Sequence, residues 1–219
     1  MMQTMEANRW AIGRRSLRLL VVLMAVDACF IVLHSTHVRY DVPGSGLWLI
    51  SRDRGYPELF QYGKEATIVA LLVALAARFR APLYPAWAAV FTYLLIDDSA
   101  EVHETAGEAL GEWLGIGTRF GIEQRDLGQI LVSGMAGAVL LGSVGLAYLN
   151  DRSPARRLSI QLLVLVVGLA FFGIVTDVID AIDLFGLVED GGEMFMLTLM
   201  LVAVFEHREQ RGTGQADPP

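Results

Sequence analysis

An unbroken apolar run, Ile130–Leu149, constrains the fold most, because it carries no charged residue. A helix needs about 20 mostly apolar residues to cross the hydrocarbon core of a bilayer. Two further runs are nearly as apolar: Leu17–Leu33, interrupted only by Asp27, and Leu158–Ile182, apolar as far as Asp177. Hydrophobic residues make up 54% of the chain and charged residues only 19%, which excludes a disordered chain and an ordinary soluble domain. We therefore predict an all-α, polytopic membrane bundle.

Three weaker segments bring the predicted number of transmembrane helices to six. Tyr84–Ile96 and Met194–Phe205 become long enough only if they extend into neighbouring acidic residues, and Ala66–Ala77 is short for a span. A polar tail, residues 212–219, is predicted to be disordered. The predicted single transmembrane domain covers residues 1–211, with spans at about 17–36, 64–80, 83–104, 127–149, 158–183 and 190–206.

The arginines predict the orientation, because short basic stretches face the cytoplasm. They precede the first predicted span, follow the second, separate the fourth from the fifth and follow the sixth. These stretches contain eleven of the sixteen arginines: Arg9, Arg14, Arg15, Arg18, Arg78, Arg80, Arg152, Arg156, Arg157, Arg208 and Arg211. All of them lie on one side if Ala66–Ala77 crosses the membrane. We expect a bacterial inner (plasma) membrane protein with both termini in the cytoplasm.

Charge and cysteine content exclude several classes of partner. The net charge of −7 argues against nucleic acid, which requires a basic surface. The single cysteine, Cys29, excludes an internal disulfide and a cysteine-based zinc site. A stripe of small residues that includes Gly134 and Gly142 predicts close helix packing in the fourth span. The expected partners are the lipid bilayer and a metal ion, and a homo-oligomer stays open.

Acidic residues gather at the ends of the spans opposite to the arginines. At about 100° per residue, a regular third span would place Asp97, Glu101 and Glu104 on one face, with His103 pointing away. The first, fifth and sixth spans carry acidic or histidine side chains at the same level. An ionised carboxylate at Asp27, inside an apolar run, costs several kcal/mol unless it is paired or meets water. Lys64, the one lysine of the chain, and Glu65 lie where they would supply a counter-charge near these acids.

These side chains predict a metal site near the outer face. Carboxylates suit Ca²⁺ or Mg²⁺ and, when histidine joins them, Mn, Fe or Zn, so the divalent metal stays unidentified. Asp27 would continue an ion path inward. The candidate ligands are Asp97, Asp98, Glu101, His103, Glu104, Asp177, Asp180, Glu189, Glu193 and His34.

The predicted function is binding of a divalent cation in this carboxylate-rich pocket, in service of cation or proton-coupled transport. One alternative is a membrane-embedded metal-dependent enzyme, in which the metal activates water or changes its redox state. Another is a non-catalytic subunit of a membrane complex. The sequence assigns no residue a catalytic role, so enzyme activity stays open.

Two motifs carry a family resemblance. One is Asp97-Asp98-x4-His103-Glu104, and the other is Glu189-Asp190-Gly-Gly-Glu193, accompanied by a Gly55-Tyr-Pro-Glu58 loop. In these features the chain resembles uncharacterised bacterial multi-pass membrane proteins over roughly its whole length. The resemblance implies the same polytopic fold and no particular activity.

Overall fold

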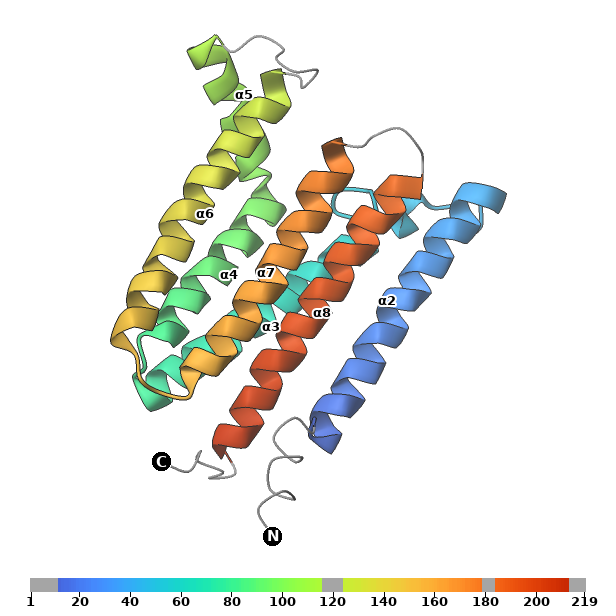
Figure 1. Cartoon of the computed structure of the whole chain (residues 1–219). Helices are drawn as coiled ribbons and strands as arrows, with labels where there is room; N and C mark the ends of the chain where they lie inside the picture. Colours follow the sequence, from blue (N-terminus) through green and yellow to red (C-terminus); the bar gives the residue numbers. More distant parts are fainter. Residues whose placement is uncertain (1–11, 116–123, 179–183, 213–219) are drawn as a thin grey trace.

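The computed structural model describes residues 12–115, 124–178 and 184–212 (Figure 1), with the backbone alone for residues 126, 174–178 and 184–186. Over these residues the chain forms seven α-helices, one short 3-10 helix and no strand, which confirms the all-α prediction. The elements are α2 (Arg14–Tyr40), η2 (Gly46–Trp48), α3 (Tyr56–Phe79), α4 (Leu83–Ala100), α5 (Val102–Leu114), α6 (Gln124–Asn150), α7 (Ala155–Val178) and α8 (Leu184–Gly212). Residues 213–219 of the predicted tail lie outside the described residues.

Four helices in the described part are long and apolar enough to cross a membrane: α2, α3, α6 from Leu127 and α7 as far as Gly173. The short run Ala66–Ala77 belongs to α3, which begins earlier than predicted, at Tyr56. Pro57 favours a helix start there because its ring fixes the backbone in a helical conformation and the first turn needs no amide donor. The helices α4 and α8 are not among these four; α4 carries Asp97 and Asp98 near its C-terminal end, and α8 carries Glu189, Asp190 and Glu193 in its first half.

The long helices run side by side and alternate in direction, so that α2 starts and α8 ends at the same end of the bundle (Figure 1). We call this the lower end, and the end that holds the α2–α3 connection the upper end. The helix α8 packs against α2, α3 and α7, while α4 packs against α3, α6 and α7. At the upper end, α5 and the start of α6 extend beyond the other helices (Figure 1).

The core of the bundle is apolar and aromatic. Tyr84, Trp87 and Phe91 follow one face of α4 and are almost completely buried, packed within one cluster with Leu72 of α3 and Met200 of α8. Large apolar side chains are instead exposed along the outer faces of α2, α6 and α7. Apolar surface of that extent is typical of a protein that meets lipid.

The predicted third span, residues 83–104, is not one helix. It ends at Ala100, Glu101 takes a left-handed conformation with φ 52°, and α5 begins at Val102. Asp97 stabilises the break, because its Oδ1 accepts the backbone N–H of His103 at 2.8 Å in the first turn of α5. The predicted continuous acidic face through Asp97, Glu101 and Glu104 is therefore wrong.

The glycines that allow two helices to pack closely, at the contact between α5 and α6, are not the predicted ones. A Cβ atom on Gly128 of α6 would lie 2.0 Å from the backbone oxygen of Gly107 of α5, so this contact requires both glycines. For Gly134 and Gly142, apart from the adjoining backbone of α6 itself, no atom of the described chain lies within 4 Å of a Cβ built there. The predicted stripe of small residues therefore does not pack against another helix of the described chain.

Candidate functional site

A buried ion pair joins three helices in the interior of the bundle. Lys64 of α3 and Asp27 of α2 are 2% and 3% exposed, and Lys64 Nζ lies 3.1 Å from Asp27 Oδ1. Lys64 also donates to the backbone oxygen of Met194 at 2.9 Å and to Thr198 Oγ1 at 3.3 Å, both on α8. Thr198 in turn donates to Asp27 Oδ2 at 2.6 Å. The ammonium thus uses its three donors, and both Asp27 oxygens have partners.

Glu65, the residue after Lys64, belongs to a second group of polar side chains. We call this group the Glu65 cluster, and it comprises Glu65 of α3, Asp98 of α4 and Glu193 of α8. Glu65 is 1% exposed, and its carboxyl lies within hydrogen-bonding reach of the Asp98 carboxyl. Glu193 is close enough to interact electrostatically with both. Its carboxylate lies against α7, where a Cβ atom on Gly173 would be 2.7 Å from Glu193 Oε1. Three carboxyls from three helices therefore interact electrostatically.

The Glu65 carboxyl does not use all of its hydrogen-bonding capacity at this position. Its Oε2 atom is buried and has no hydrogen-bond partner among the described residues. Two ionised carboxylates are acceptors only, so Glu65 and Asp98 can share a hydrogen bond only when one of them carries a proton. A cation between them would relieve their repulsion in the same way.

Polar groups lead from the cluster to the upper end. Tyr62, one turn before Glu65 on α3, donates to Glu58 Oε1 at 2.5 Å and contacts the backbone oxygen of Asp98 at 3.0 Å. Glu58 accepts the backbone N–H of Arg54, at the start of α3. Asp190, one turn before Glu193, interacts electrostatically with Glu58. Polar side chains of α3 and α8 therefore lie between the Glu65 cluster and the α2–α3 connection.

The helix break brings His103 to Asp97, against the prediction that it points away. His103 Nδ1 lies 3.1 Å from Asp97 Oδ2, and Asp97 is 6% exposed. The hydrogen bond to Asp97 raises the pKa of His103 above its usual value, although partial burial works in the opposite direction. The nearby charges of Glu104 and Asp98 raise the His103 pKa further.

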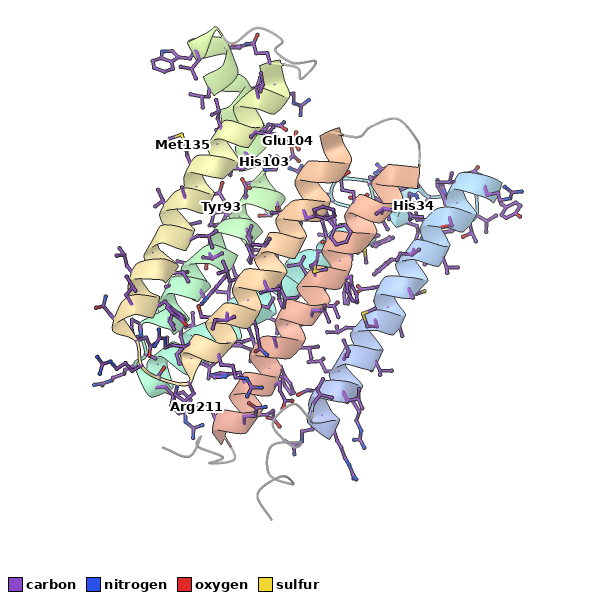
Figure 2. The ribbon with its side chains drawn as sticks, in the orientation of Figure 1. His34, Tyr93, His103, Glu104, Met135 and Arg211 are labelled. Atoms are coloured by element: carbon purple, nitrogen blue, oxygen red, sulfur yellow. The ribbon has the colours of Figure 1, made fainter. Side chains whose placement is uncertain are left out.

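Of the other predicted ligands, His34, Glu101 and Glu104 have partners outside the Glu65 cluster. His34 on α2 accepts the backbone N–H of Ile50 at 3.1 Å, and Figure 2 shows it far from His103, across α7 and α8. Glu101 pairs with Arg54 at 3.3 Å, and Glu104 pairs with Arg125. Glu189 interacts electrostatically with Glu193 and Asp190. The side chain of Asp177 and the whole of Asp180 lie outside the described residues.

The described residues include no group of three or more histidine, cysteine, aspartate or glutamate side chains arranged to hold a metal ion. Six of the ten predicted ligands are instead distributed among the Glu65 cluster, the Asp97–His103 pair and two ion pairs with arginine. Of the polar interior groups, Thr198 was missed because nothing distinguishes a threonine in an apolar run from one that bonds its own helix. The arrangement is suited to holding protons or another cation at Glu65.

The polar interior does not continue to the lower end. Below Thr198, the interior-facing residues of α8 are apolar, among them Met200 and Val204, for about nine residues or 14 Å. The next buried polar pairs are Trp87 with Ser159, in which the indole N–H donates to the hydroxyl at 2.9 Å, and His207 with Tyr84, whose ring nitrogen and hydroxyl are 2.8 Å apart. An apolar layer therefore separates the two polar levels.

Comparisons with known proteins give one family and no relative. No curated protein and no solved structure matches the chain. A family model described as a domain of unknown function (DUF8692) matches residues 54–207. This match includes Lys64, all of the Glu65 cluster and Thr198, whereas Asp27 on α2 lies before it. The chain belongs to the DUF8692 family.

Proposed function

We propose that this is a six-span membrane protein that binds a cation at the Glu65 cluster and uses it in cation or proton-coupled transport. The observation that carries the proposal is the Glu65 carboxyl, which is 1% exposed, faces Asp98 and leaves Oε2 without a donor. A buried carboxyl so placed needs a positive partner.

The balance of charges around the Glu65 cluster also indicates that a positive partner is required. The basic groups whose charge reaches Glu65 and Asp98 are Lys64 and His103. Lys64 is engaged by Asp27, and His103 is engaged by Asp97. With Glu193 added, the cluster holds more carboxyls than these two bases neutralise. A mobile cation would supply the missing charge.

A proton suits this arrangement better than the divalent ion expected from the sequence. Two facing carboxyls can share one proton, whereas Ca²⁺ takes six to eight oxygen ligands. The polar route past Tyr62 and Glu58 provides access from the upper end, and the Lys64–Asp27 pair lies at its inner limit. The arginine distribution supports an upper end that faces away from the cytoplasm of a bacterial inner membrane.

The proposal is tested by cation-driven proton movement in vesicles. Acid-loaded proteoliposomes with an internal pH dye receive Na⁺, K⁺, Mg²⁺, Ca²⁺ or Mn²⁺ outside, one at a time. We expect at least one cation to relieve the acid load with wild-type protein. Glu65→Gln and Asp98→Asn should abolish the response, and Glu108→Gln, at an exposed acid of α5, should retain it. The same slow leak in wild-type, variant and empty vesicles would contradict the proposal.

A further inference from the structure

A groove opens at the lower end of the bundle, between α2, α7 and α8. It has a volume of about 490 Å³ and lies outside the Glu65 cluster. The helix α8 forms its floor, because α8 packs against both α2 and α7. Leu20 of α2 and Val164 of α7 stand on its two walls. Val164 is 65% exposed, so the groove lies beside the apolar surface that meets lipid.

The groove is apolar at one end and polar at the other. Towards the middle of the bundle its lining includes Leu165, Leu199 and Val202. Towards the lower end the same helices contribute Arg157 and Gln161 from α7 and Glu206 from α8. From Leu199 to Gln210 on α8 the groove extends about 16 Å, roughly half of the hydrocarbon thickness of a bilayer. That is the depth of one leaflet.

We propose that this groove binds a zwitterionic aminophospholipid of the leaflet at the lower end. An acyl chain matches the apolar walls, and the rim carries one charge of each sign at the level of the headgroup. Arg157 is placed to bind the phosphate, because a guanidinium matches phosphate oxygens in two-point hydrogen bonds. Glu206 is placed to accept from the ammonium group. Its Oε2 already accepts the Gly13 N–H and its Oε1 the Gln210 amide, and a carboxylate retains further lone pairs for a third donor.

The test is native mass spectrometry of the full chain released from detergent with added phosphatidylethanolamine or phosphatidylglycerol. We expect wild-type protein to retain one phosphatidylethanolamine per chain in preference to phosphatidylglycerol. Arg157→Gln should lower retention of both lipids roughly tenfold, because each loses a charge-assisted hydrogen bond. Arg152→Gln, an exposed arginine of the same end that does not line the groove, should leave retention unchanged.

Two further variants separate headgroup binding from folding defects. Glu206→Gln keeps an acceptor for Gly13 and removes the charge, so it should reverse the preference towards phosphatidylglycerol. Ala203→Phe fills the apolar part of the groove while both charges remain, and it should reduce retention of both lipids. Equal retention of the two lipids by wild-type protein, or no change in Arg157→Gln and Ala203→Phe, would overturn the proposal.

Discussion

Lys64 and Asp27 form an ion pair that is almost completely buried between α2 and α3. A lone lysine and an aspartate inside an apolar run both require compensation in a membrane interior, so the sequence predicts a counter-charge near each. The structure pairs them and adds Thr198 and the Met194 backbone oxygen. The identity of the pair could not be predicted, because it depends on how α2, α3 and α8 pack.

Removal of one partner of this pair should destabilise the protein strongly. Lys64→Met leaves the Asp27 charge buried and unpaired, which costs about 3–5 kcal/mol. The double change Lys64→Met with Asp27→Asn should recover most of this loss, since no charge remains. Free energies of unfolding in mixed micelles provide the measurement, with Arg14→Met, at an exposed arginine, expected within about 0.5 kcal/mol of wild type. A double variant as unstable as Lys64→Met would contradict the pairing.

His103 should make stability depend on pH. Its pKa is raised in the folded protein, chiefly by the hydrogen bond to Asp97, with Glu104 and Asp98 adding to the effect. The folded state therefore holds this proton more tightly than the unfolded state. The stabilisation is complete below the ordinary histidine pKa of 6.5 and is lost as the pH rises through the raised value.

The measurement is the melting temperature from pH 5 to 9 for wild type and His103→Gln, about the range in which histidines titrate. We expect the difference between the two proteins to shrink as the pH rises. A difference that stays constant across this range would show that the charge of His103 does not stabilise the fold.

At the scale of elements, the apolar runs predicted where the helices lie better than where they end. The break at Glu101 has no proline or glycine to signal it, and a non-glycine residue with positive φ is uncommon. It forms because Asp97 binds the amide of His103 and so caps a new helix. As a result Asp98 faces Glu65 within the bundle, while Glu101 and Glu104 pair with arginines. A sequence analysis that assumes one unbroken helix therefore could not distinguish the carboxylate that belongs to the Glu65 cluster from the two that pair with arginines.

The α5–α6 contact offers a matched pair of glycine substitutions on one helix. Gly128→Ala places a methyl group against the Gly107 backbone, which cannot move aside as a flexible side chain would. We expect a loss of about 1–3 kcal/mol in the free energy of unfolding. Gly134→Ala meets no atom within 4 Å and should be neutral or slightly stabilising, because alanine is the better helix former. Equal effects of the two substitutions would contradict the packing of α5 on α6.

For the whole molecule, composition and hydropathy predicted an all-helical membrane protein, and four helices of the described part meet that expectation by length and composition. The sequence could not establish the number of spans, because α4 and α8 carry the very carboxylates that form the site. The helices α2, α3, α4, α6, α7 and α8 alternate in direction, so the start of α2 and the end of α8 lie at the same end of the bundle, as the six predicted spans would require (Figure 1).

Cysteine labelling tests this topology. Cys29→Ser removes the single native thiol, after which cysteines are placed singly at Ser45, Arg80 and Ser153. A membrane-impermeant maleimide should label Ser45→Cys on intact cells. It should label Arg80→Cys and Ser153→Cys only after lysis, because both lie in the arginine-rich connections. Labelling of Ser45→Cys and Arg80→Cys from the same side would exclude α3 as a span.

The central claim, a proton shared between Glu65 and Asp98, is tested most directly by infrared spectroscopy of the purified protein. At neutral pH we expect a carbonyl band of a protonated carboxyl that persists in wild type and in Glu108→Gln, and disappears in Glu65→Gln and in Asp98→Asn. Chelator should change neither this band nor the melting temperature. Absence of the band from wild type, together with a melting temperature that falls with chelator and recovers with added divalent metal, would contradict a shared proton.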